Sequence, residues 1–165
     1  MTQYVKVALL GSGYAGKSTL IKLLTDKTAT LDSNYVPTAG MDCGTITIDS
    51  TTKVSLVEMA GQSHFEFLWP DLLKGSTMVV VVTDSTPKEV LRTRQLLEKY
   101  KDLLVGMQII VIANKQDLPG AMKPESVQDL LGLPTYGMVA IDPKQRVTGY
   151  RAIINELRNM CRVAS

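Results

Sequence analysis

A glycine-rich segment near the start of the chain constrains the fold more than any other feature. Residues 11–18 read GSGYAGKS and fit the pattern G-x-x-x-x-G-K-[ST]. An apolar run over residues 4–10 precedes this segment, and residues 19–24 continue it in a sequence typical of a helix. Because glycines let several backbone N–H groups converge and the helix start adds its positive dipole end, this strand–loop–helix unit predicts a phosphate-binding loop. The alternative is a plain glycine-rich turn, which rarely matches the pattern with these flanks.

Two side chains of this loop are suited to meet a bound nucleotide. The Lys17 ammonium can reach the β- and γ-phosphates as a point charge, so we predict a catalytic as well as a binding role for it. The Ser18 hydroxyl can ligate Mg²⁺. The predicted phosphate contacts are Gly11, Ser12, Gly13, Tyr14, Ala15, Gly16, Lys17, Ser18 and Thr19.

The composition limits the class of protein. With 165 residues, 45% of them hydrophobic and 21% charged, the chain suits a single globular domain over residues 1–165. Its formal net charge of +2 is too small to favour nucleic acid or an anionic membrane as a partner. The two cysteines, Cys43 and Cys161, are far apart in sequence, and we interpret them as reduced thiols rather than as a disulfide.

Neither the ends nor the interior of the sequence predicts attachment to a membrane. No apolar run approaches the ~20 residues that span a bilayer. The N-terminus lacks a signal-peptide pattern and the glycine of a myristoylation signal, and the C-terminus is one residue too long after Cys161 for a prenylation box. We therefore expect a cytoplasmic protein without an intrinsic membrane anchor.

Apolar runs and polar breaks alternate along the rest of the chain. The predicted strands cover residues 4–10, 43–49, 53–58, 78–82, 107–113 and 135–141. The predicted helices are one that ends near residue 26, then 64–73, 87–104, 124–132 and 145–162. This alternation predicts an α/β fold with a six-stranded, mostly parallel sheet, one antiparallel edge strand and helices on both faces. Residues 27–42 form a long polar loop, and such loops are usually functional.

Several polar segments follow the predicted strands or lie in the long loop. They are Thr38 after Pro37, EMAGQ at 58–62, NKQD at 114–117 and VAI at 139–141. Because ligands of parallel sheets bind at the carboxyl ends of the strands, the segments that end strands should lie close to the glycine-rich loop.

The order of these segments resembles that of the Ras superfamily of small GTPases over essentially the whole chain. Within the superfamily the sequence is most similar to the Arf-like branch. The similar segments are VPTAG at 36–40, Leu68-Trp69, TDS at 83–85 and ANKQDLPGAM at 113–122. The resemblance implies the fold of a P-loop NTPase, GTP and GDP as ligands, and Mg²⁺ as a cofactor. The N-terminal membrane helix of Arf proteins is not matched, because the chain begins almost at its first strand.

The resemblance also implies how guanine is recognised. The Asp117 carboxylate would accept from the N1–H and 2-amino groups of guanine, a donor pair that adenine does not offer. Asn114 would brace the base pocket, the stem of Lys115 would pack over the base, and the Ala140 N–H would meet guanine O6. The predicted base contacts are Asn114, Lys115, Asp117, Leu118, Ala140 and Ile141.

A third set of residues is implied for the metal and for hydrolysis. Thr38 would ligate Mg²⁺ beside Ser18 while the γ-phosphate is bound, and Glu58 would act on the metal through water. The Gly61 N–H would meet the γ-phosphate, and Gln62 would orient the attacking water, a role for which Ras is the type case. We interpret the single histidine, His64, as a solvated residue rather than a catalytic one.

The sequence departs from the family pattern where hydrolysis and Mg²⁺ binding are concerned. The family usually has Asp at the position of Glu58, so a longer carboxylate either still serves the metal or crowds it. No arginine stands just before Thr38, so we expect slow hydrolysis, which an arginine from an activating protein would speed by ~10³–10⁵.

The resulting hypothesis is a GTP-hydrolysing switch that binds an effector or regulatory protein through residues 33–75. One alternative is a regulatory or scaffold subunit that holds guanine nucleotide without cycling. Another is a nucleotide kinase or ATPase, against which the NKQD segment at 114–117 argues.

Overall fold

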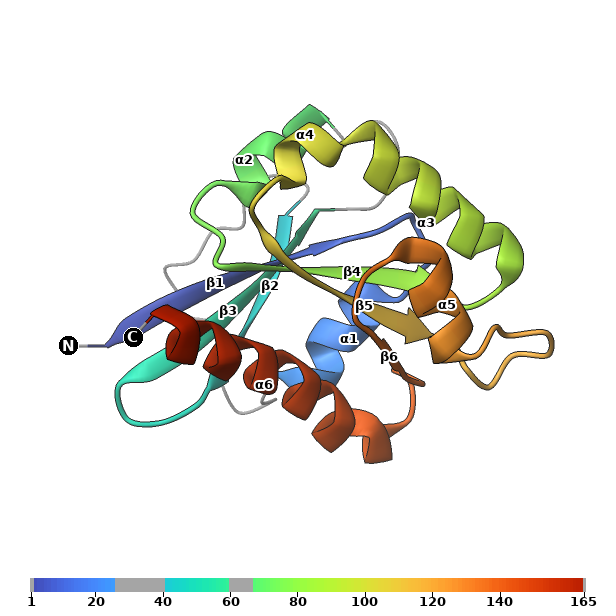
Figure 1. Cartoon of the computed structure of the whole chain (residues 1–165). Helices are drawn as coiled ribbons and strands as arrows, with labels where there is room; N and C mark the ends of the chain where they lie inside the picture. Colours follow the sequence, from blue (N-terminus) through green and yellow to red (C-terminus); the bar gives the residue numbers. More distant parts are fainter. Residues whose placement is uncertain (1, 26–40, 60–66, 165) are drawn as a thin grey trace.

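Six strands form the central sheet of the protein (Figure 1). This computed structural model describes residues 2–25, 41–59 and 67–164. The strands are β1 (Gln3–Leu10), β2 (Met41–Thr47), β3 (Thr52–Met59), β4 (Met78–Asp84), β5 (Gln108–Asn114) and β6 (Thr135–Gly137). Their order is β2-β3-β1-β4-β5-β6, and among these strands only β2 and β3 pair antiparallel. This sheet confirms the predicted fold class.

Helices cover both faces of the sheet (Figure 1). They are α1 (Lys17–Leu24), α2 (Trp69–Leu73), α3 (Pro87–Lys99), α4 (Lys101–Leu104), α5 (Pro124–Leu131) and α6 (Arg146–Ala164), with a short 3₁₀ turn over Pro143–Gln145. The apolar side chains of α1 and α6 pack on one face, and those of α2, α3, α4 and α5 pack on the other. No described helix is long and apolar enough to cross a bilayer.

Alternating side chains of the central strands face the two layers of helices. In β4, Met78, Val80 and Val82 pack on the side of α1 and α6, while Val79 and Val81 pack on the side of α2 and α3. All of them are 2% exposed or less. A strand that is covered on both faces needs apolar side chains at every position, which is why the run of residues 78–82 predicts a central strand.

The helix predicted over residues 87–104 is interrupted at Tyr100. This residue has φ −108° and ψ 17° and separates α3 from α4. Its ring packs against Trp69 of α2, with 4.7 Å between the ring centroids, so a tertiary contact coincides with the break. Leu91 of α3 is 50% exposed, so it does not take part in the core. Of the helix predicted over residues 64–73, the structure describes the part from Phe67, and α2 begins at Trp69.

The last strand is shorter than predicted and ends at Gly137. The final pair of β5 and β6 is Ala113 with Gly137. One further hydrogen bond joins the two segments, from the Met138 N–H to the Ala113 oxygen at 3.0 Å, while the Asn114 carbonyl faces β4 and accepts from the N–H and the hydroxyl of Ser85. Residues 138–141, predicted as strand, lie outside β6, and the chain turns there at the carboxyl edge of the sheet.

Candidate functional site

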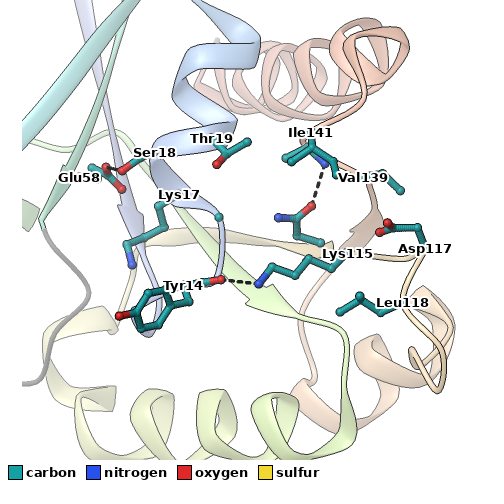
Figure 2. A pocket seen from close by; sticks show the side chains of 14 residues that line it. Tyr14, Lys17, Ser18, Thr19, Glu58, Lys115, Asp117, Leu118, Val139 and Ile141 are labelled. Atoms are coloured by element: carbon teal, nitrogen blue, oxygen red, sulfur yellow. Dashed lines mark hydrogen bonds between the residues drawn. The ribbon is translucent and has the colours of Figure 1, made fainter.

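A cavity of about 590 Å³ opens at the carboxyl edge of the sheet. Four segments that are distant in sequence surround it: the loop before α1 with the start of that helix, the end of β3, the loop after β5 and the turn after β6 (Figure 2). The lining residues are Gly13, Tyr14, Gly16, Lys17, Ser18, Thr19, Glu58, Asn114, Lys115, Asp117, Leu118, Val139, Ala140 and Ile141. The segments predicted to contact phosphate, base and metal thus share one cavity.

The Lys17 side chain is buried and extends toward the first residues of the glycine-rich loop. Its Nζ donates to the main-chain oxygens of Gly11 at 2.9 Å and Ser12 at 3.0 Å, and the residue is 5% exposed. Burial lowers the pKa of Lys17, and the negative charge of Glu58 partly opposes this effect. A cation that is removed from water and held mainly by neutral carbonyl groups favours an anionic ligand.

The start of α1 adds a second source of positive potential. Gly16 is the N-cap, with φ 105°, and no side chain caps the helix. The first turn carries no acidic residue. The first N–H groups of a helix have no intrahelical partner, so those at Lys17, Ser18 and Thr19 can bind an anion at the cavity wall.

Asn114 joins the glycine-rich loop to the turn after β6. Its Nδ2 donates to the Ala15 oxygen at 3.0 Å, and its Oδ1 accepts from the Ala140 N–H at 2.9 Å. These partners fix which amide atom is nitrogen, because one is an acceptor and the other a donor. Gly16 completes the arrangement, since a Cβ at this position would overlap the Asn114 amide.

Lys115 makes a second bridge to the glycine-rich loop. Its Nζ donates to the main-chain oxygen of Tyr14 at 2.7 Å (Figure 2). The same Nζ lies 3.5 Å from Asp84 Oδ2. The stem of Lys115 therefore spans the cavity between the loop and β5. The Tyr14 side chain, which is bulky for a phosphate loop, is 93% exposed at the rim.

The mouth of the cavity carries one carboxylate and two exposed apolar side chains. Asp117 is exposed, and among the described residues no group donates a hydrogen bond to its carboxylate. Leu118 and Ile141 stand nearby, with Ile141 75% exposed. Apolar walls with a few polar groups between them suit a flat heteroaromatic ligand.

Glu58 reaches the same cavity from β3. It is 3% exposed, and its Oε1 accepts a hydrogen bond from the Ser18 hydroxyl (Figure 2). A hydroxyl oxygen and a carboxylate are hard oxygen ligands of the kind that Mg²⁺ prefers. The donor set therefore fits this cation, with phosphate oxygens and water as its further ligands. Within the described residues no group of three or more His, Cys, Asp or Glu side chains is placed to hold a metal alone.

The structure brings most of the predicted residues to the cavity, but not all. Gly11, Ser12 and Ala15 belong to the loop yet do not line the cavity, because their carbonyls serve Lys17 and Asn114. The Ala140 N–H, predicted to meet the base, is bonded to Asn114. Thr38, Gly61 and Gln62 lie outside the described residues. The roles of all these residues stay predictions.

Several residues that the sequence-based prediction did not place at the site support it. Val139 lines the cavity, and Asp84 pairs with Lys115. Gln116 Nε2 donates to the Ser85 hydroxyl at 2.7 Å, and that hydroxyl donates to the main-chain oxygen of Asn114 at 2.5 Å. These residues belong to the segments VAI at 139–141, TDS at 83–85 and NKQD at 114–117, but no pattern in the sequence indicated these contacts.

Comparison with known proteins agrees with this geometry. The sequence profile of the family described as "Arf: ADP-ribosylation factor family" matches residues 1–157. ADP-ribosylation factor-like protein 10 of Mus musculus is 33% identical over 129 residues, which cover 78% of this chain and 52% of the mouse protein.

Two further relatives come from distant organisms. ADP-ribosylation factor-like protein 8b of Arabidopsis thaliana is 29% identical over 79% of this chain and 71% of its own length. ADP-ribosylation factor K of Dictyostelium discoideum is 31% identical over 78% of this chain and 68% of its own length. The chain thus spans about half the length of the mouse protein and about two thirds of the other two. With the family profile covering nearly all of it, the chain belongs to the ADP-ribosylation factor family of small GTPases.

Proposed function

We propose that this protein is a guanine-nucleotide switch that hydrolyses GTP slowly with Mg²⁺. The observation that carries the proposal is the single cavity in which Lys17 and the start of α1 face the same space as Asp117. An anion-binding end and a hydrogen-bond acceptor at the mouth suit a ligand with phosphates at one end and a base at the other.

The groups at the phosphate end of this cavity carry positive charge or a positive dipole. Lys17 would exchange its two carbonyl partners for β- and γ-phosphate oxygens, which balance its charge better than neutral groups do. The backbone N–H groups at the start of α1 would bind the same phosphates. Their positions are set by the Gly16 turn and by Asn114, so little rearrangement is needed when the ligand binds.

The base end would select guanine. The Asp117 carboxylate accepts two hydrogen bonds, and guanine offers two donors on one edge where adenine does not. The Lys115 stem forms a wall for the base plane, and Asn114 holds the turn at Ala140 in place. A site built to accept hydrogen bonds rejects ligands that lack the donors by ~10⁴ or more.

The cation site and the reaction centre would meet at Ser18. Ser18 and Thr38 are the proposed metal ligands, Glu58 would act on the metal through water, and bound Mg²⁺ would supply charge neutralisation on the phosphate oxygens. Gln62 would orient the attacking water, and an effector or activating protein would bind residues 33–75. The cytoplasmic location expected from the sequence also stays a prediction.

The test is the identity of the bound nucleotide, followed by a hydrolysis time course. Mass spectrometry of the purified protein should find GDP or GTP rather than adenine nucleotides. Single-turnover measurements with Mg²⁺ should then show slow phosphate release that cell extract accelerates. Equal affinity for ATP and GTP in a competition titration would overturn guanine selectivity and favour the kinase or ATPase alternative.

A non-cycling regulatory or scaffold subunit is the second candidate. The observation in its favour is the buried Glu58 carboxylate bonded to Ser18, the hydroxyl that Mg²⁺ would need. Bound GTP without phosphate release, both with and without cell extract, would select this candidate over the cycling switch.

A further inference from the structure

Glu58 contacts the cation site more directly than a water-mediated role requires. Its carboxylate lines the cavity, and its Oε1 is in hydrogen-bond contact with the Ser18 hydroxyl oxygen. Glu58 is 3% exposed, whereas Ser18 is exposed, so the contact lies where the wall of the cavity meets its open space. The two oxygen atoms therefore adjoin each other at the position where Ser18 would ligate a divalent cation.

The spacing of these oxygens suits one shared ion. Oxygen ligands of Mg²⁺ lie ~2.0–2.1 Å from the metal in near-octahedral geometry, so neighbouring ligands are about 3 Å apart. Oxygen atoms in hydrogen-bond contact are ~2.5–3.0 Å apart. Ser18 and Glu58 can thus occupy adjacent positions of one coordination shell after only a small separation of the two oxygens.

The pairing of β3 with its two neighbours fixes the backbone position from which the Glu58 side chain reaches Ser18. Its strand pairs on both sides, with Leu9 of β1 and Asp42 of β2 opposite Glu58. A carboxylate one methylene shorter at the same backbone position would end about 1.5 Å farther from Ser18, the length of one C–C bond. The shorter carboxylate would then be too far from Ser18 for direct contact, whereas the glutamate reaches it.

We infer that Glu58 binds the divalent cation directly, as an inner-sphere ligand beside Ser18, and not through water. The inference rests on the proposed function, since the cation enters with the nucleotide. It also has a consequence for selectivity. Mg²⁺ gives up its waters reluctantly and demands near-ideal geometry, so replacing a water with a buried carboxylate favours the larger, more tolerant Mn²⁺.

The test counts the water molecules on the metal. Mn²⁺ and GDP are bound to the full-length chain, and electron paramagnetic resonance in ¹⁷O-enriched water reports the waters in the first shell. With Ser18, Glu58 and one β-phosphate oxygen as ligands, about three of six positions remain for water. A count of about four in the unmodified protein would overturn the inference without any variant.

Two variants sharpen this measurement. Glu58→Asp should gain one water relative to the unmodified protein, and Glu125→Asp on the exposed first turn of α5 should leave the count unchanged. The same Glu58→Asp change should raise the preference for Mg²⁺ over Mn²⁺, measured as the cation concentration that slows GDP release, by about tenfold. Equal water counts in Glu58→Asp and the unmodified protein would contradict direct binding.

The outcomes also separate the inference from the proposed function. If GDP binds and Mn²⁺ keeps about four waters, only the direct contact of Glu58 is wrong. If calorimetry detects no GDP binding with either cation, the proposed function fails and the inference fails with it.

Discussion

Lys115 Nζ donates a hydrogen bond to the main-chain oxygen of Tyr14 at 2.7 Å, and both residues have positive φ, 61° and 66°. In residues 2–25, 41–59 and 67–164 they are the only non-glycine residues with positive φ. A left-handed conformation costs an L-residue ~1–2 kcal/mol, and such strain is retained where the surroundings enforce it. The hydrogen bond therefore couples the loop after β5 to the glycine-rich loop.

Lys115→Ala should loosen this coupling. We expect the free energy of unfolding to fall by about 1 kcal/mol, because the lost bond is charge-assisted but half-exposed. Release of a fluorescent GDP analogue should become faster, since the two loops would no longer be joined. Urea unfolding and stopped-flow fluorescence measure the two effects. Lys101→Ala is the matched control, because Lys101 pairs with Glu98, an exposed residue one helical turn away; equal effects would contradict the coupling.

Gly16→Ala should lower the free energy of unfolding much more than the same change at a glycine with open space around it. The new Cβ would displace the Asn114 amide and force alanine into a left-handed backbone. Strain and lost hydrogen bonds together should lower the free energy of unfolding by about 3 kcal/mol.

The matched control for this change is Gly132→Ala. Gly132 also has positive φ, 69°, but a Cβ there would meet nothing within 4 Å. Only the conformational cost, about 1 kcal/mol, should appear. Similar losses for both variants in thermal or urea unfolding would show that the Gly16–Asn114 contact is unimportant.

Asp117→Asn should change base preference from guanine toward xanthine. An amide can donate where the carboxylate accepted, and xanthine presents an acceptor at the position of the guanine 2-amino group. Competition between GDP and XDP for a fluorescent nucleotide measures the preference. Asp129→Asn, an exposed residue of α5, should leave it unaltered. If Asp117→Asn also leaves it unaltered, Asp117 does not recognise the base.

Ser18→Ala should weaken nucleotide binding only when Mg²⁺ is present. The hydroxyl is the proposed metal ligand, while the Lys17 ammonium and the backbone N–H groups that would hold the phosphates remain. GDP affinity measured with Mg²⁺ and with EDTA should therefore converge in this variant. Ser126→Ala on the surface of α5 serves as the control. A Mg²⁺ dependence as large as that of the unmodified protein would exclude Ser18 as a ligand.

The sheet could be predicted well because its signals are local. Apolar runs such as residues 78–82 mark strands buried on both faces, and polar breaks mark their carboxyl ends. The errors occurred where one element depends on another. The helix over 87–104 breaks where Tyr100 packs on Trp69, and the strand predicted over 135–141 ends at Gly137, beside the loop after β5 whose Gln116 N–H donates to the Met138 oxygen. Neither contact can be predicted from the residues of the helix or strand that ends there.

The contacts within the site also could not be predicted from the sequence. Patterns identified the glycine-rich loop and NKQD, and the resemblance assigned roles to their residues. No pattern indicated that the Ala140 N–H bonds to Asn114 or that Lys17 lies on the carbonyls of Gly11 and Ser12. Such contacts depend on side-chain packing in the assembled edge of the sheet.

The sequence by itself determined the α/β class, the family and the residue types that could meet phosphate, base and metal, because each rests on residues close together along the chain. Only the tertiary structure decided how those segments meet. Asn114 contacts a residue 99 positions away, Lys115 one 101 positions away, and Glu58 one 40 positions away. The order of strands in the sheet brings these partners together, and the length of each side chain then decides which atoms touch. For Glu58, the length of the side chain brings its carboxylate from β3 to the Ser18 hydroxyl.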